Sequence, residues 1–199
     1  VEVEWPDGRR AFGTTTFTAN STNQIWIDDA LPGGATTAAD GGDTWNWVSS
    51  NPAPYSGKLA FQSSVQTGEH DVSFMGANDQ NDSSVGAVGP MQVSTGDTLY
   101  AWVYLNPASP PTELMLCWYD GSSYEHRAYW GANQITWGTS NSAGRYHAGA
   151  LPAAGKWVEI SVPASAVGLP GLSVSGMTFA AYGGQVTWDR IGRTNPATP

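Results

Sequence analysis

The chain of 199 residues has little charge, one cysteine and no long apolar run. Asp, Glu, Lys and Arg make up 13% of the residues, against about 25% in an average soluble domain. The single cysteine, Cys117, excludes an internal disulfide and a zinc site built from several cysteines. It lies in the apolar run LMLCWY, so we expect a buried, unreactive thiol. Such runs are too short to span a bilayer, and we expect no membrane insertion.

Basic residues are also scarce, with 8 Lys and Arg against 17 Asp and Glu and a formal net charge of -9. An acidic surface repels phosphate groups, so we expect no nucleic-acid partner and no attraction to anionic membranes. The sequence begins with Val and shows no signal peptide, and we expect it to be part of a larger multidomain protein. Few Lys and many Ser, Thr, Gly, Asn and Trp residues are typical of a secreted protein.

Aromatic residues and turn formers are abundant instead, with 10 Trp, 8 Tyr, 24 Gly and 13 Pro. Segments of alternating polar and apolar residues recur roughly every 8–15 residues with turn residues between them, and no apolar stripe has a helical period. These features predict an all-β fold, an antiparallel β-sandwich of jelly-roll type with an N-terminal β-hairpin extension. The only helix-like piece is PASAVGLPG at 163–171, at most one turn.

We divide the chain into three segments. Residues 1–23 form an N-terminal hairpin and linker, because VEVEW and RRAFGTTTFT flank the turn PDG and ANSTNQ follows. Residues 24–193 form the β-sandwich, and residues 194–199 a C-terminal tail. The turn DGSS at 120–123 and the pair Gly183-Gly184 each predict a hairpin within the sandwich.

The segment DTLYAWVYL at 97–105 is the clearest strand, and it separates two kinds of side chain. Side chains alternate in a strand, so Leu99, Ala101, Val103 and Leu105 share one face, which we assign to the core. The other face carries Tyr100, Trp102 and Tyr104. These rings either lie under a loop or the N-terminal segment as a second minor core, or form an exposed shelf.

The stretch CWYDGSSYEHRAYWGANQITWGT at 117–139 holds a second group of rings. A two-residue loop would place Tyr119, Tyr124, His126 and Trp130 on one face. A three-residue loop would place Trp118 with Tyr124, His126 and Trp130, and Tyr119 with Arg127 and Tyr129. The register stays open, but either one puts at least three rings on one face.

About half of the Trp residues are expected in the core, because rings dominate core energetics. Three of them lie in periodic strands and are our choice for the core: Trp26, Trp157 and Trp188. Trp45 and Trp47 form another cluster beside the loop SSNPAPY.

The segments AAGKWVEISVPASAVGL and VSGMTFAAYGGQVTWDRIG resemble the carbohydrate-binding-module β-sandwiches of bacterial glycan-degrading and surface proteins. IWIDDALPGG and WNWVSSNPAPYSGKLAFQS are similar to their opening strands. The resemblance covers roughly residues 24–193 and implies glycan binding. Rings stack on sugar faces, and amides, guanidinium groups and carboxylates bind hydroxyls. The candidate ligand-binding residues are Tyr100, Trp102, Tyr104, Trp118, Tyr124, His126, Arg127 and Trp130.

A structural Ca²⁺ is the cofactor that the same resemblance implies. Asp28 and Asp29 follow the first strand of the predicted sandwich, and Asp189 lies on the last. First and last strands are often neighbours in a jelly roll, so these three are the candidate metal ligands, to which Asp40 and Asp43 could add oxygens.

Catalysis has little support in the sequence. No recognisable acid/base pair of carboxylates, no H-E-x-x-H spacing and no G-x-S-x-G motif is present. We therefore expect a non-catalytic module that binds a polysaccharide or oligosaccharide. The alternative is a structural or adhesion module of a large secreted bacterial protein without a small ligand, and a glycan-active hydrolase or lyase is the weaker possibility.

Overall fold

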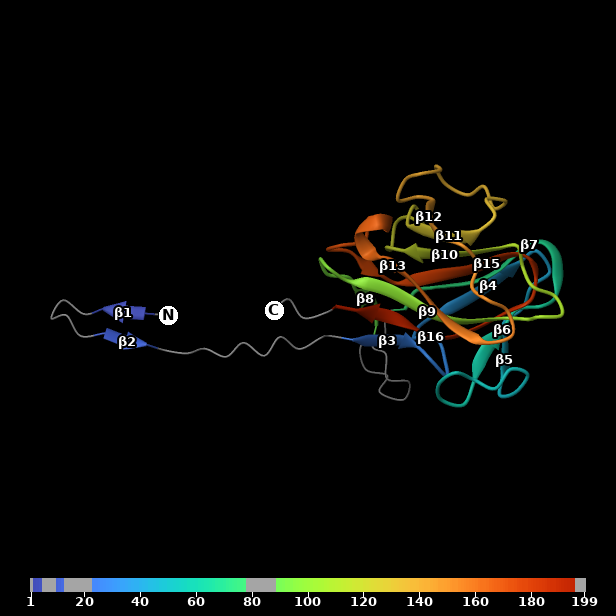
Figure 1. Cartoon of the computed structure of the whole chain (residues 1–199), viewed down its shortest axis with the longest axis horizontal. Helices are drawn as coiled ribbons and strands as arrows, with labels where there is room; N and C mark the ends of the chain where they lie inside the picture. Colours follow the sequence, from blue (N-terminus) through green and yellow to red (C-terminus); the bar gives the residue numbers. More distant parts are fainter. Residues whose placement is uncertain (1, 5–9, 13–22, 78–88, 196–199) are drawn as a thin grey trace.

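The computed structural model describes residues 2–4, 10–12, 23–77 and 89–195. Two stacked β-sheets form the body of the domain (Figure 1). Sheet I has the strand order β12-β11-β10-β15-β7-β4. Sheet II has the order β13-β9-β16-β6-β5, and β3 also pairs with β16. The chain is thus an all-β sandwich, as predicted.

The bounds of the strands follow. Sheet I comprises β4 (Thr36–Asp40), β7 (Gln66–Met75), β10 (Glu113–Tyr119), β11 (Arg127–Gly131), β12 (Tyr146–Gly149) and β15 (Gly176–Gly184). Sheet II comprises β3 (Gln24–Ile27), β5 (Asn46–Val48), β6 (Ala60–Gln62), β9 (Thr98–Leu105), β13 (Trp157–Pro163) and β16 (Val186–Thr194). A separate antiparallel pair joins β8 (Met91–Gln92) to β14 (Ser173–Val174).

The pairing within both sheets is antiparallel except for β11 and β12, which are parallel. The predicted helix-like piece is a single 3₁₀ turn, η1 (Ala164–Val167), which ends at Gly168 in the left-handed conformation, φ 71°. Among the described residues, no helix has the length and apolar character needed to cross a bilayer.

The N-terminal hairpin consists of β1 (Glu2–Glu4) and β2 (Arg10–Phe12), which pair antiparallel. Most of the predicted linker, residues 13–22, lies outside the described residues, as do residues 196–199 of the predicted tail.

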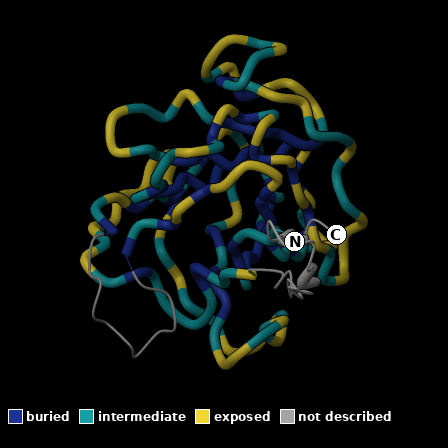
Figure 2. Tube along the Cα trace, turned by 90° about the vertical axis from the view of Figure 1, so that its left-hand side faces the viewer, coloured by how far each residue is buried: buried dark blue, intermediate teal, exposed yellow. Residues whose placement is uncertain are grey.

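The main core lies between the two sheets, where buried residues concentrate while exposed ones gather in the connecting loops (Figure 2). On β9 the alternation is as predicted, because Leu99, Ala101, Val103 and Leu105 are buried in this core. Trp26 and Trp188 are also buried there, as predicted. The core prediction for Trp157 is wrong: this residue is half-buried on the outer face of sheet II, where it pairs with Tyr104.

The predicted hairpin at Gly183-Gly184 is a crossing between the two sheets. The flanking strands β15 and β16 belong to sheet I and sheet II and do not pair with each other. Both glycines have positive φ, 66° and 68°, which turns the chain over the edge of the sandwich. A Cβ at Gly184 would lie 2.4 Å from the backbone nitrogen of Pro111, so a residue with a side chain does not fit there.

Candidate ligand-binding site

The outer face of sheet II carries a row of rings. Strand alternation places Tyr100, Trp102 and Tyr104 of β9 on this face, opposite the aliphatic core residues of the same strand. Trp157 of β13 is the register partner of Tyr104, and the two ring centroids lie 5.9 Å apart. Trp102 and Tyr104 are half-buried, whereas Tyr100 is 8% exposed. The sequence therefore predicted correctly that these rings share a face away from the main core.

The loop 49–59 crosses this face and covers part of the ring row. Tyr55 stacks on Trp102 with ring centroids 3.6 Å apart and an interplanar angle of 11°. The indole Nε1 of Trp157 donates a hydrogen bond to the carbonyl oxygen of Ala53 at 2.9 Å. Tyr55 is 42% exposed, so it is the ring that this face offers most openly to solvent.

Asp189 of β16 holds the loop in this position. Its Oδ2 accepts hydrogen bonds from the backbone N–H groups of Tyr55 at 2.7 Å and Ser56 at 3.0 Å. Asp189 is the register partner of Trp102, so one side chain fixes the loop directly beside the ring that the loop covers. Burial, and then the adjacent Asp28 carboxyl group, raise the pKa of Asp189 to about 7, while hydrogen bonds from the backbone N–H groups of Ser56 and Arg190 oppose this shift.

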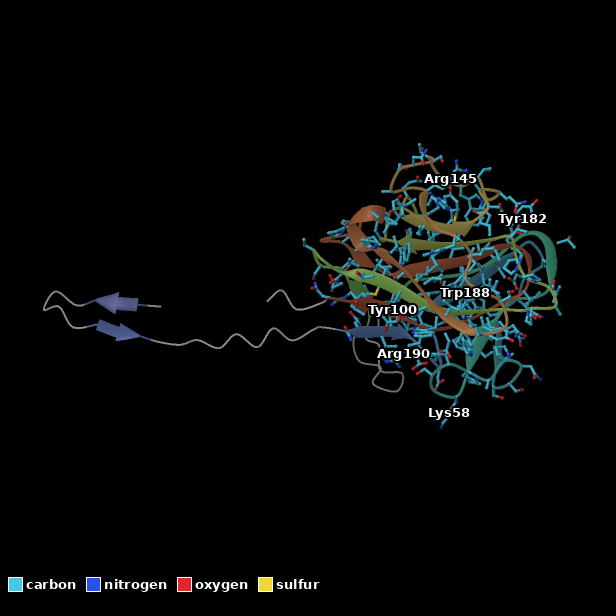
Figure 3. All side chains as sticks on the ribbon, viewed as in Figure 1. Lys58, Tyr100, Arg145, Tyr182, Trp188 and Arg190 are labelled. Atoms are coloured by element: carbon cyan, nitrogen blue, oxygen red, sulfur yellow. The ribbon has the colours of Figure 1, made fainter. Side chains whose placement is uncertain are left out.

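Two hollows open on the outer face of sheet II, one at the Tyr55–Trp102 stack and one at Tyr104. The first, of about 520 Å³, is lined by Tyr55, Tyr100 and Trp102 together with the charged side chains of Glu159 and Arg190. In Figure 3, Tyr100 and Arg190 lie in the lower layer of the sandwich, away from Tyr182 of sheet I. The guanidinium of Arg190 donates to the Ser56 hydroxyl at 3.1 Å.

The second hollow, of about 330 Å³, is lined by Tyr104 and by neutral polar side chains. Three of these form an amide network: Asn106 donates to Gln185 at 2.7 Å, and Gln185 donates to Gln62 at 3.3 Å. Amides present both donors and acceptors, which suits hydroxyl groups of a ligand. The face therefore combines stacking rings with neutral and charged hydrogen-bonding groups.

The rings of the β10–β11 segment do not join this face, because both strands belong to sheet I. Trp118 and Trp130 are 2% and 5% exposed and pack in the main core. The expected exposure of Trp130 is therefore not found, and neither ring can stack on a ligand. The cause is the register, which places Leu116 opposite Ala128 and Leu114 opposite Trp130 and turns these residues between the sheets.

The connection between β10 and β11 is longer than either register considered from the sequence. The backbone N–H of Trp118 donates to the carbonyl oxygen of His126 at 2.9 Å, so the residues between these two form the loop. Cys117 pairs with Arg127, so Tyr119, Arg127 and Tyr129 share the outer face as the three-residue option had it. Tyr124 instead packs beside Tyr119, with ring centroids 4.7 Å apart and planes tilted by 32°.

His126 and Arg127, predicted as donors to a ligand, are engaged within the chain. His126 Nδ1 lies 2.7 Å from the carbonyl oxygen of Val167, and its Nε2 lies 3.3 Å from Asp120 Oδ2. Arg127 donates to Glu125 Oε1 at 2.9 Å and to the carbonyl oxygen of Gly144 at 3.0 Å. Both side chains hold loops on sheet I, so we leave them out of the binding site.

The predicted metal ligands are partly brought together. β3 and β16 are neighbours, as expected for first and last strands, and Asp28 lies beside Asp189. The Oδ1 atom of Asp28 is buried and has no hydrogen-bond partner, which fits a cation ligand. Asp29 is engaged elsewhere, because its Oδ1 accepts from the N–H groups of Lys58 and Leu59 at 2.6 and 2.8 Å.

Two further observations reduce the number of residues that could be metal ligands here. Asp43 is paired with His70, its Oδ2 lying 2.7 Å from His70 Nδ1, and Asp40 lies on the edge strand β4 of sheet I. In the part of the chain that the structure describes, no group of three or more His, Cys, Asp or Glu residues could hold a metal ion. Asp28 and Asp189, with oxygens from the backbone or water, are the residues that would hold Ca²⁺.

Sequence reasoning missed Tyr55 as a site residue. It lies in the Pro-rich loop SSNPAPY, which the sequence placed beside the Trp45–Trp47 cluster. Those two rings are half-buried: Trp45 packs against Phe61 at 5.0 Å and stacks with Trp47 at 6.4 Å. The sequence does show that Tyr55 is an aromatic residue in a loop of turn-forming residues. It does not show that Tyr55 stacks on Trp102, because Trp102 is far away in the sequence.

No protein-family model and no curated protein matches this chain. Among solved structures its fold is similar to carbohydrate-binding modules and adhesin domains. For the family 11 carbohydrate-binding module of Clostridium thermocellum, the identity is 10% and the TM-score 0.48, over 89% of this chain and 98% of that chain. The K3 adhesin domain of Lys-gingipain from Porphyromonas gingivalis gives 16% and 0.46, over 89% and 100%.

A third similar structure is the glycoside hydrolase domain of Endo-D from Streptococcus pneumoniae, with 8% identity and a TM-score of 0.48 over 81% of this chain. The present chain spans 21% of that chain's length. At these identities the likeness is one of fold alone. The chain is thus a β-sandwich domain similar in architecture to carbohydrate-binding modules, without an assigned family.

Proposed function

We propose that the chain is a non-catalytic glycan-binding module whose ligand lies across the outer face of sheet II. One observation carries the proposal: Tyr55 stacks on Trp102 beside a polar hollow of about 520 Å³, and a second hollow of about 330 Å³ opens at Tyr104 on the same face. One face of the Tyr55 ring is covered at 3.6 Å, yet the residue is 42% exposed. Its other face is therefore available to a sugar ring.

The chemistry of the hollows supports a sugar as the ligand. A pyranose ring presents C–H groups to an aromatic face and hydroxyls at its rim, which need donors and acceptors. The first hollow supplies Glu159 and Arg190, and the second supplies the amides of Asn106, Gln62 and Gln185. Because two hollows open along one face, the first at the Tyr55–Trp102 stack and the second at Tyr104, the proposed ligand is an oligosaccharide or polysaccharide that extends beyond one sugar.

The remaining parts of the proposal concern the setting of the module. We place it in a secreted protein with further domains, a setting that the chain's composition suits. Ca²⁺, held by Asp28 and Asp189, would supply positive charge between two adjacent carboxylates and so help to fix the loop that carries Tyr55.

The test is affinity electrophoresis of the full chain against a panel of soluble polysaccharides, followed by titration calorimetry with the best ligand. Tyr55→Ala and Trp102→Ala should each weaken binding by about 5- to 150-fold, the equivalent of about 1–3 kcal/mol for one stacking ring. Tyr146→Ala is the matched control, because Tyr146 is an equally large exposed ring, 36% exposed, on β12 of sheet I. It should leave binding unchanged.

A structural or adhesion module is the competing function, and one observation favours it. Trp118 and Trp130 lie in the core, and Tyr55 covers one face of Trp102, so part of the aromatic content serves packing. Two results would contradict the glycan site on sheet II. One is that no polysaccharide of the panel retards the chain, and the other is that the Tyr55→Ala variant binds as tightly as the unmodified chain.

A further inference from the structure

The outer face of sheet I carries a ring framed by carboxylates. Tyr182 of β15 is the register partner of Glu113 on β10 and of Glu69 on β7. Asp71, two residues beyond Glu69 on the same strand, projects to the same face diagonally from Tyr182. Asp40 of the edge strand β4 lies opposite Asp71. In Figure 3, Tyr182 lies in the upper layer, away from Tyr100 and Arg190.

Two of these carboxylates, Glu69 and Asp71, have no basic partner in the part of the chain that the structure describes. The side-chain carboxylates of Glu69 and Asp71 accept no hydrogen bond and form no ion pair within the described residues. Burial, followed by the charges of Asp40, Glu69 and Asp43, raises the pKa of Asp71 from 3.8 to about 6, while His70 opposes this shift. His70 is itself paired with Asp43 in the interior, at 2.7 Å, and does not reach this face as a free cation.

Glu113 is a second, independent observation on this face, because one oxygen of its carboxyl group has no hydrogen-bond partner among the described residues. The residue is fully buried beneath the segment after β11, where its Oε2 accepts hydrogen bonds from the N–H groups of Gln134 and Ile135. Its Oε1 is buried and has no partner among the described residues. Arg145 lies near enough to lower the pKa of Glu113, but burial outweighs it and the pKa is raised. Strand alternation directs this side chain to the face that holds Tyr182.

Further rings extend this face. Tyr124, Trp137 and Tyr182 are partly exposed and pack on a small apolar cluster that covers the middle of sheet I, formed by Met115, Cys117, Tyr129, Ile135 and Ala180. A ring that rests on a packed floor is held in one orientation, which suits stacking. The face thus joins rings with unpaired carboxylates, whereas the first hollow of sheet II is lined by both a carboxylate, Glu159, and a guanidinium, Arg190.

We propose that the outer face of sheet I around Tyr182 is a second binding site, and that its ligand is a glycan bearing free amino groups. An amino sugar satisfies both features of the face. Its C–H groups stack on a ring, and its ammonium group pairs with the carboxylates of Glu69 and Asp71 and with the π face of Tyr182. This site is separate from the one proposed on sheet II, so either can fail without the other.

The experiment uses the full chain and two matched ligands, a glucosamine oligomer and the same oligomer fully N-acetylated, in titration calorimetry at low salt. The glucosamine oligomer should bind, and the acetylated one should bind at least tenfold more weakly, because acetylation removes the charge. Glu69→Gln, Asp71→Asn and Tyr182→Ala should each weaken binding of the glucosamine oligomer by about 2- to 5-fold, as expected for one exposed ionic or cation–π contact.

Two controls distinguish binding at this site from a general effect of net charge and from binding at the sheet II site. Glu125→Gln removes the same charge from an exposed carboxylate that is already paired with Arg127, and it should leave binding unchanged. Tyr55→Ala should likewise leave it unchanged. A melting temperature for each variant guards against loss of fold, and the two conservative variants Glu69→Gln and Asp71→Asn keep the side-chain shape.

Three results would overturn the proposal: no measurable binding of the glucosamine oligomer, equal binding by the Glu69→Gln and Asp71→Asn variants, or a lysine oligomer that binds as tightly as the glucosamine oligomer. The last result would show a face that attracts any cation and does not recognise a sugar.

Discussion

Tyr55 lies flat on Trp102, with ring centroids 3.6 Å apart and planes 11° from parallel. Trp102 belongs to the central strand β9, whereas Tyr55 belongs to a loop that Asp189 ties down through two backbone N–H groups. The rigid sheet thus positions one ring, and that ring positions the second. This arrangement presents an aromatic face to solvent on the surface that we propose for glycan binding.

The first prediction separates binding rings from core rings. Tyr55→Ala should lower the free energy of unfolding by about 1 kcal/mol, the order of one aromatic pair, while weakening glycan binding. Trp130→Ala should lower it by about 3–5 kcal/mol, because it leaves a cavity in the main core. Urea unfolding and calorimetric titration of both variants measure the two effects. A Tyr55→Ala variant as unstable as Trp130→Ala would mean that the loop is part of the core.

The second prediction concerns Ca²⁺. Added Ca²⁺ should raise the thermal midpoint and excess EDTA should lower it, because a ligand at a hundred times its Kd stabilises the folded state by about 2.7 kcal/mol. Asp28→Ala should abolish the response, since it removes the unpartnered Oδ1. Asp29→Asn is the matched control: it should lower stability through its bonds to Lys58 and Leu59 but keep the response. Thermal midpoints that change neither with Ca²⁺ nor with EDTA would contradict the proposed Ca²⁺ site.

The third prediction uses the raised pKa of Asp71. Because its folded pKa is about 6, above its ordinary value of 3.8, the folded state binds this proton more tightly than the unfolded state does. Asp71 therefore lowers stability as pH rises through that window. Asp71→Asn, which mimics the protonated carboxyl, should melt at a higher temperature than the unmodified chain at neutral pH. This difference should shrink as pH falls from about 6 to 3.8.

Melting curves of both proteins at a series of pH values provide the measurement for Asp71. The groups that surround it, Asp40, Glu69, Asp43 and His70, are the same in both proteins, so their titration cancels to first order in the comparison. A stability difference that stays constant across the range, or an Asn variant that is less stable at neutral pH, would be evidence against the shift.

The fourth prediction concerns Cys117. Its side chain is buried, 1% exposed, and burial raises the pKa of its thiol to about 12 despite the nearby Arg127. The reactive thiolate is therefore both rare and inaccessible. Iodoacetamide at neutral pH should leave the folded chain unmodified and should alkylate it fully in denaturant, as mass spectrometry would show. Rapid alkylation without denaturant would mean that β10 opens readily.

Local patterns in the sequence were sufficient for the fold class and for individual strands. The alternation in DTLYAWVYL placed Leu99 and Val103 in the core and Tyr100, Trp102 and Tyr104 on the opposite face, because side-chain direction in a strand depends on position alone. The neighbouring position of the first and last sandwich strands also agreed with the expectation. In the same way, Cys117 lay in a continuous apolar run and proved to be buried.

Tertiary structure decided which rings meet and which are covered. Trp130 and Tyr129 are adjacent in sequence, yet their registers against β10 turn the first into the main core and the second to the outer face. The crossing at Gly183-Gly184 looked like a hairpin because turn chemistry does not specify whether the next strand joins the same sheet. The contact of Tyr55 with Trp102, and the frame of Glu69, Asp71 and Glu113 around Tyr182, join residues far apart in the chain. They exist only because strand pairing within sheet I and the anchoring of one loop on sheet II bring these side chains together.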